Sequence, residues 1–438
     1  MCYNIINIFL EEFILPQKFS LGEGVEGLFI EDSRFNTTLV SFNFYMPLRD
    51  ESYEDFALLP YVLSSCSDEY KTFRALNTEL GNLYGATLSG GSVKVMDYQR
   101  ISLSVSVLND RFSLGGESVV SRAAELLASL IFAPSLQGEA FCERDVEREK
   151  QQMLDRIRGE INNKRGYARS KTLSLMFGSD PFGIPRFGRE DRMQKVNGKS
   201  LFAAWSEMLR SAYIRINVIG AEMPEGIFSA AGKAFSAISR ENITSFGGFN
   251  MPNLTEGGTV CERMDIAQGK LVMGFSLGRV GDEKSSADIA VMSDIFGGGP
   301  YSCLFVNVRE KLSLCYYCAC SAIRSKAIMM VDSGVEAANE PKARAEILNQ
   351  LEIMKNGGFT AEQFDSSIRN ICDTVKSVGD SQEAINTWYA SRVFDSSIST
   401  PEEFIAAIEA VTPEQVKQAA QAVKLHTVYS LLPKEDKQ

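Results

Sequence analysis

The chain has 438 residues, with 45 basic and 56 acidic side chains and a single histidine. Its net charge of −11 disfavours nucleic acid as a partner, because binding to a phosphate backbone depends on lysine and arginine. A hydrophobic content of 45% is enough for large cores and excludes a disordered chain. Since His426 is alone, we do not expect this chain by itself to perform chemistry that needs two histidines.

The N-terminal apolar run at residues 5–10 is too short to span a bilayer, and acidic residues follow it. It therefore predicts neither a signal peptide nor a membrane anchor. The nine cysteines are odd in number and scattered, which suits a reducing compartment. We expect a cytoplasmic protein without membrane contact. Residues 314–321 predict a strand that places Cys318 and Cys320 on one face, in a core rather than at a metal ion.

Hydrophobic periodicity predicts the same series of elements in each half of the chain: a strand, an apolar helix, a strand pair, a charged helix, a polar helix and a terminal strand. In the first half these lie at residues 38–46, 56–64, 82–88 with 101–108, 143–158, 199–209 and 214–220. In the second half they lie at residues 269–276, 287–296, 313–318 with 328–334, 365–378, 413–423 and 427–432.

This repetition indicates a duplicated unit. The fold class is therefore α+β, with two homologous domains that each contain an antiparallel β-sheet packed with α-helices. The first domain is expected at residues 1–238 and the second at residues 263–438. Residues 239–262 are rich in Gly, Pro, Asn and Thr and predict the interdomain linker.

Three stretches carry a resemblance to a known family. They are the run from Leu58 to Ala86, the segment Phe-Gly-Ile-Pro-Arg-Phe-Gly at 182–188, and the glycine-rich turn at 297–299 that leads to Arg-Glu-Lys and Leu-Cys-Tyr316. In their order and spacing they resemble the insulinase-like (M16) metallopeptidase family, especially its short members made of two homologous α+β domains. The resemblance covers about residues 20–432.

Catalytic members of this family carry an inverted zinc motif, His-x-x-Glu-His, on the first long helix. The resemblance places Pro60 and Ser64 at the two histidine positions and Leu63 at the position of the catalytic glutamate. Glu147 or Glu149 lies near the position of the third zinc ligand, but one carboxylate cannot hold zinc, and the preferred interpretation is a solvated helix face with i,i+4 charge pairs. We therefore expect no metal, no cofactor and no independent peptidase activity.

The family's second domain contributes an arginine and a tyrosine, seven residues apart, that contact the substrate. Arg309 and Tyr316 have this spacing and lie in the matching motif. A guanidinium and a phenol together can hold a peptide carbonyl and its oxyanion. Without the surrounding motif, a solvated or ion-paired arginine and a core tyrosine would be the preferred explanation of these residues, whereas the motif favours a role in substrate binding. The neighbouring Tyr317 is expected to point to the opposite sheet face.

The resemblance implies a non-catalytic subunit that pairs with a zinc-bearing M16 homologue, acts on a peptide or protein substrate, and supplies half of an enclosed chamber. Within the family, the run Leu-Leu-Pro-Tyr-Val-Leu at 58–63 is most similar to bacterial proteins associated with aminopentanol modification of elongation factor P. The alternative is a peptide- or partner-binding scaffold without hydrolytic activity, possibly a homodimer.

Overall fold

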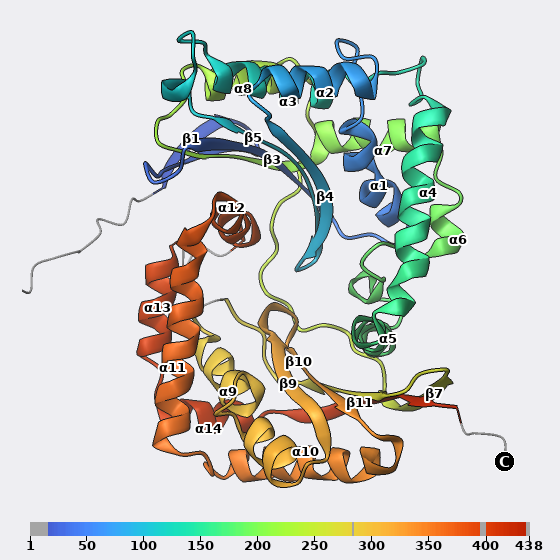
Figure 1. Ribbon diagram of the computed structural model, residues 1–438, viewed down its shortest axis with the longest axis vertical. Coiled ribbons are helices and arrows are strands. Elements are labelled where there is room, and N and C mark those ends of the chain that lie inside the picture. Colours follow the sequence, from blue (N-terminus) through green and yellow to red (C-terminus); the bar gives the residue numbers. More distant parts are fainter. Residues whose placement is uncertain (1–15, 283, 395–399, 435–438) are drawn as a thin grey trace, which may run out of the picture.

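The structure is a computed structural model that describes residues 16–434 apart from residues 283 and 395–399. Figure 1 shows the first half of the chain above the second, each built around its own sheet. Strands β1 to β6 form a six-stranded sheet in the order β1-β2-β6-β3-β5-β4, and β7 to β11 form a five-stranded sheet in the order β7-β11-β8-β10-β9. The apolar run at residues 5–10 lies outside the described residues.

In the first half the strands are β1 (Gln17–Gly22), β2 (Val25–Glu31), β3 (Thr37–Pro47), β4 (Thr87–Val95), β5 (Tyr98–Leu108) and β6 (Tyr213–Gly220). Its helices are α1 (Tyr53–Leu63), α2 (Phe73–Asn82), α3 (Val119–Phe132), α4 (Glu143–Gly159), α5 (Lys164–Phe177), α6 (Glu190–Met193), α7 (Gly198–Ser211) and α8 (Ile227–Ser236).

In the second half the strands are β7 (Gly258–Met264), β8 (Gly269–Ser276), β9 (Cys315–Ile323), β10 (Ile328–Val335) and β11 (Lys424–Pro433). Its helices are α9 (Ala287–Gly297), α10 (Glu340–Lys355), α11 (Ala361–Lys376), α12 (Gln382–Ser391), α13 (Pro401–Glu409) and α14 (Pro413–Gln421). No helix of the described residues is both long and apolar enough to cross a membrane.

The two sheets share one topology, which confirms the α+β fold with a repeated unit. Strands β2, β6, β3, β5 and β4 of the first sheet correspond in order to β7, β11, β8, β10 and β9 of the second. Each sheet also contains one parallel pair, β2 with β6 and β7 with β11, so the sheets are mixed rather than wholly antiparallel. The predicted elements did not include β2 or β7, so this pairing was not foreseen.

Side-chain alternation on β5 explains how the first sheet separates a core from a polar face. Ile101, Leu103 and Val105 are fully buried in the N-terminal core, whereas the alternating Ser102 and Ser104 remain partly exposed. Strands with this alternation bury one face only. The polar face is the one directed toward the second half of the chain.

Helix α12 of the second half docks on this polar face. Gln382 donates hydrogen bonds to the carbonyl oxygens of Thr37 and Ile219, both at 2.8 Å. The Tyr45 hydroxyl donates to the carbonyl of Ala390 at 2.7 Å, and its burial raises the pKa of Tyr45 to about 12. Figure 1 shows α12 directly beneath the upper sheet. The two halves are therefore joined by specific polar contacts as well as by the connecting chain.

The connection between the halves has no regular secondary structure from residue 239 to residue 257. The expected linker extended to residue 262, but β7 begins at Gly258, because residues 258–264 pair with β11 far along the chain. Part of the connection is anchored by Phe246, whose ring packs against Tyr45 and Tyr98 at centroid distances of 5.8 and 5.2 Å.

Candidate functional site

The end of α1 carries Pro60, Leu63 and Ser64, the residues that the resemblance aligns with the zinc motif. Pro60 lies inside the helix, Leu63 is fully buried, and the Ser64 hydroxyl donates a hydrogen bond to the Pro60 carbonyl oxygen at 2.7 Å. Strand β4 lies directly against this turn: a Cβ atom on Gly90 would be 2.6 Å from Ser64 Oγ and 2.7 Å from the Pro60 oxygen. This packing brings β4 against Pro60 and Ser64, neither of which offers an imidazole.

The two glutamates of α4 that were expected near the third-ligand position, Glu147 and Glu149, are engaged in local pairs. Glu147 pairs with Lys150 at 2.7 Å and accepts a hydrogen bond from Gln151 at 2.6 Å, and these contacts lower the pKa of Glu147. Glu149 pairs with Arg148 at 2.9 Å. No group of three or more His, Cys, Asp or Glu side chains suited to a metal ion occurs among the described residues. These contacts are those of an ion-paired helix face, and the donor set does not fit a zinc ion.

Arg309 lies in a π-helical turn, η4 (Phe305–Lys311), which precedes β9. Its guanidinium lies over the Phe305 ring at 4.5 Å from the centroid, and its Nε atom is 3.6 Å from a Glu310 carboxylate oxygen. The side chain is 40% exposed. Turns of π-helix are rare in proteins overall, and those that occur often lie at functional sites. Sequence periodicity had no means of predicting this winding.

Tyr316 is placed by a β-bulge in the edge strand β9. Tyr317 pairs with Gly334 and Cys315 pairs with Val335, so Tyr316 is the extra residue between them. Bulges of this kind redirect a side chain. Tyr316 is 59% exposed, and its hydroxyl donates a hydrogen bond to Glu336 at 3.3 Å.

Arg309 and Tyr316 are thus both solvent-accessible, but no hydrogen bond or ring contact joins them within the described residues. Cys315 precedes the bulge and Cys318 follows it, and both contact the C-terminal core. A hydrogen bond from Cys318, with a smaller contribution from the positive charge of Arg309, lowers the pKa of Cys315 to about 7. Cys318 and Cys320 both contact the C-terminal core, which confirms their predicted common face.

The sequence did not predict an ion-pair cluster that joins the two halves, formed by Asp332, Arg165 and Arg169, which we call the clasp. Asp332 on β10 is buried and pairs with two arginines of α5, Arg165 at 2.5 Å and Arg169. Arg165 also lies over the Tyr317 ring at 4.5 Å from the centroid. Tyr317 therefore belongs to the contact between the halves, whereas Tyr316 faces solvent. The sequence offered no signal for this clasp, because its residues are more than 140 positions apart.

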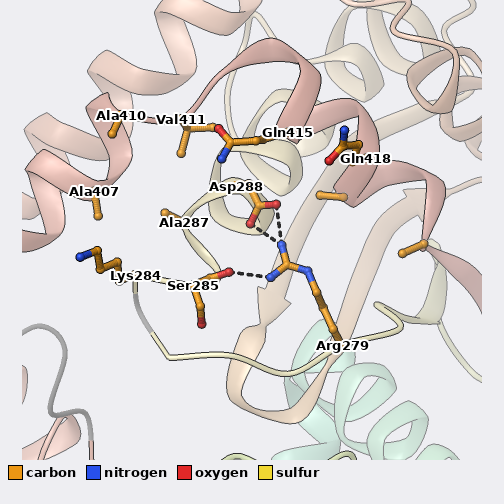
Figure 2. Close-up of a pocket in the computed structure, with 12 residues that line it drawn as sticks. Arg279, Lys284, Ser285, Ala287, Asp288, Ala407, Ala410, Val411, Gln415 and Gln418 are labelled. Carbon is orange, nitrogen blue, oxygen red and sulfur yellow. Dashed lines mark hydrogen bonds and ion pairs between the residues drawn. The ribbon is translucent and has the colours of Figure 1, made fainter.

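A separate cavity of about 590 Å³ lies on the outside of the second half, between the chain before α9 and helices α13 and α14 (Figure 2). Its arginine, Arg279, pairs with Asp288 and donates to the Ser285 carbonyl. The charge of Arg279 is therefore balanced within the cavity wall. Neither Arg309 nor Tyr316 lines this cavity.

Comparison with protein families matches residues 195–371 to the Peptidase M16 inactive domain. The chain is 27% identical over 413 residues to the "Probable inactive metalloprotease YmfF" of Bacillus subtilis, an alignment that covers 93% of this chain and 96% of that protein. It is 26% identical over 314 residues to an "Uncharacterized zinc protease" of Rickettsia bellii, covering 68% of this chain and 71% of that protein.

Among solved structures, a conserved protein from Enterococcus faecalis V583 superposes with a TM-score of 0.88 at 25% identity, covering 97% of this chain and 100% of that one. The peptidase M16 inactive domain from Pseudomonas fluorescens superposes with a TM-score of 0.78 at 17% identity, covering 97% and 99%, and supports the fold alone. Over residues 195–371 the chain is thus similar to the Peptidase M16 inactive domain, and over most of its length it is similar to a protein named as a probable inactive metalloprotease. It also has the repeated α+β unit, and residues 60–64 contain no histidine.

Proposed function

We propose that this chain is the non-catalytic subunit of a heterodimeric M16-type zinc metallopeptidase. It contributes half of the peptide-binding chamber and a substrate clamp formed by Arg309 and Tyr316. One observation carries the proposal: both side chains are accessible to solvent, while the zinc-motif positions at the end of α1 are packed against β4. The chain has kept polar groups suited to substrate binding and lacks the residues that would activate water.

The chemistry of the clamp is that of an oxyanion site. The Arg309 guanidinium has several N–H donors in a fixed plane, and the Tyr316 phenol has one O–H donor. Their present partners, Glu310 and Glu336, lie at 3.6 and 3.3 Å. Contacts of this length at exposed groups are weak, so a peptide carbonyl can replace them. An oxyanion would form only when a water, activated by zinc on the partner subunit, adds to the carbonyl carbon, and the two donors would then stabilise it.

The relatives support a zinc-bearing partner of the same family. Three proteins named as uncharacterized zinc proteases align with this chain, as does the "Antilisterial bacteriocin subtilosin biosynthesis protein AlbE" of Bacillus subtilis. A role beside elongation factor P modification rests only on the similarity of residues 58–63 and is the narrower form of the proposal. In the scaffold alternative the same surface would bind a peptide or partner without turnover.

The test is co-purification with native partners, followed by metal analysis of the complex and assays of the reconstituted pair. Tyr316→Phe removes one hydroxyl, so assembly should persist while turnover falls on the order of a hundredfold. Arg309→Lys should also lower turnover, because an ammonium ion lacks the planar fork. Tyr317→Phe is the matched control, since that hydroxyl is buried in the contact between the halves.

Full activity of Tyr316→Phe and Arg309→Lys would show that these side chains are structural and would contradict the clamp. A complex that contains no zinc and no turnover, but binds peptide less tightly in both variants, would identify the scaffold instead.

A further inference from the structure

Two cysteines flank the bulge in the edge strand β9. Cys315 pairs with Val335 of β10 and Cys318 pairs with Ser333, so the cysteines are three positions apart while their partners are only two positions apart. In a regular strand, residues three positions apart point to opposite faces of the sheet. Here the extra residue of the bulge, Tyr316, brings both cysteines to the same face, where both contact the C-terminal core.

The strand register also sets the distance between the two cysteines. Two positions along β10, from Ser333 to Val335, correspond to about 6.6 Å. Because each cysteine lies opposite one of these residues, we expect a similar spacing between the Cα atoms of Cys315 and Cys318. This spacing lies within the range of about 4.4–6.8 Å that a disulfide bridges. A hydrogen bond between the two thiol groups brings their sulfur atoms next to each other.

The two thiols differ in exposure and in reactivity. Cys315 is partly exposed, whereas Cys318 is only 5% exposed. The hydrogen bond from Cys318, assisted by Ser333 and by the positive charge of Arg309, outweighs burial and lowers the pKa of Cys315 to about 7. The same hydrogen bond, together with burial, raises the pKa of Cys318. Since a thiolate is the nucleophile in disulfide exchange, Cys315 is the thiol that reacts first.

The third cysteine of β9 is less suited to this chemistry. Cys320 follows Cys318 on the same face of the strand, opposite Val331 of β10. Burial raises the pKa of Cys320, so its thiol stays protonated. Cys320 raises the pKa of Cys318 by its charge alone, whereas Cys315 forms a hydrogen bond with Cys318. The cysteine placed to join Cys318 is therefore Cys315.

We propose that Cys315 and Cys318 form a reversible dithiol site that a low-molecular-weight disulfide oxidises. The Cys315 thiolate attacks one sulfur of the oxidant and releases one thiolate, which leaves a mixed disulfide on Cys315. The Cys318 sulfur then attacks Cys315 Sγ, forms the internal disulfide and releases the second thiolate. The two thiol protons pass through solvent to the two released thiolates. The cysteine pair thus loses two electrons, and the oxidant is reduced to two thiols.

The internal disulfide acts on the segment that carries Tyr316. It encloses Tyr316 and Tyr317 in a covalent ring and so restricts the bulge that exposes the Tyr316 side chain. Oxidation also removes the negative charge of the Cys315 thiolate, which lies near the Arg309 guanidinium. Formation of the disulfide does not depend on the substrate clamp or on a zinc-bearing partner, so its test is separate from that of the proposed function.

Treatment of the native full chain with oxidised glutathione tests the proposal. After the remaining thiols are blocked with N-ethylmaleimide, chymotrypsin cleavage beyond Tyr316 or Tyr317 places Cys315 and Cys318 on separate peptides. Mass spectrometry should find these two peptides joined in the absence of reductant and separate after dithiothreitol. A disulfide between Cys318 and Cys320 would stay within one peptide and would contradict the proposal.

Variants of the cysteines test the order of the two steps. Cys318→Ala keeps this core position apolar, so Cys315 should accumulate as its mixed disulfide with glutathione. Cys315→Ser should lose the internal disulfide and leave the buried Cys318 reduced. Cys261→Ser is the matched control, because Cys261 is exposed on β7, and this variant should form the internal disulfide as before. If Cys261 reacted with glutathione while Cys315 and Cys318 stayed reduced, or if Cys318→Ala formed no mixed disulfide at Cys315, the proposal would be overturned.

Discussion

The clasp around Asp332 gives a direct test of how the two halves are held together. Asp332→Asn keeps the size of the side chain and removes its charge, which Arg165 and Arg169 now share. Asparagine retains one carbonyl acceptor but turns its NH₂ group toward a guanidinium. The variant therefore loses one charge-assisted hydrogen bond and leaves two cations without their counter-ion.

The magnitude follows from the burial of the three side chains. Removing one partner of a fully buried pair costs about 3–5 kcal/mol. Here the Asp332 side chain is 2% exposed, but Arg165 and Arg169 are 49% and 28% exposed and can recover part of their hydration. We therefore expect a loss of roughly 2–3 kcal/mol in the free energy of unfolding.

Urea unfolding followed by circular dichroism measures this loss as a lower midpoint with an unchanged slope. Asp373→Asn is the matched control, because Asp373 forms an exposed pair with Lys376 on a helix at 3.4 Å. Such pairs contribute below about 1 kcal/mol. If Asp332→Asn were no more destabilising than Asp373→Asn, the clasp would not join the halves as we infer.

Three further predictions concern the region between the halves. Burial lowers the pKa of Lys94 from 10.5 to about 8, so the unfolded chain binds more protons between these values and stability gains from this group as pH rises from 8 to 10.5. Lys94→Met should remove that rise, which thermal midpoints at pH 7.5 and 10.5 would detect; an unchanged pH dependence would contradict it. Tyr317→Phe removes a buried hydroxyl without a described partner, so the unfolding free energy should stay constant or increase by up to about 1 kcal/mol. Limited proteolysis should cut first at residues 247–257, which are mostly exposed, and a first cut inside a helix would argue against this.

Local hydrophobic patterns in the sequence were sufficient to predict most of the strands and helices of the fold. The predicted strand at residues 269–276 coincides with β8, and the predicted helix at residues 287–296 coincides with α9 except for one residue. Alternating or helical periodicity fixes such elements without reference to the rest of the chain. By contrast, β7 is mostly exposed and weakly patterned, and it becomes a strand by pairing with β11 more than 150 residues later. Local reasoning therefore assigned its first residues to the linker.

In the candidate site too, features that depend only on local sequence could be predicted, whereas features that depend on distant contacts could not. The absence of the zinc-motif histidines could be determined from the sequence, because it requires only residue identities. The exposure of Tyr316 depends on a β-bulge, and the position of Arg309 depends on a π-turn. Neither irregularity has a reliable single-sequence signal. The role of Tyr317 beside Arg165 depends on contacts between the halves, which no motif encodes.

The difference between the end of α1 and the region of η4 and β9 supports the proposal that this chain binds substrate while a partner carries the zinc ion. On α1, Ser64 bonds to the Pro60 carbonyl and β4 approaches at Gly90, so restoring histidines would require movement of a packed strand as well as two substitutions. On η4 and β9, the polar groups of Arg309 and Tyr316 remain outside the core and keep contacts that a substrate can displace. A tyrosine that served packing alone would be expected to bury its ring, whereas Tyr316 is 59% exposed. Under the proposed function, a partner that brings a zinc ion would use these exposed donors and would also supply the activated water.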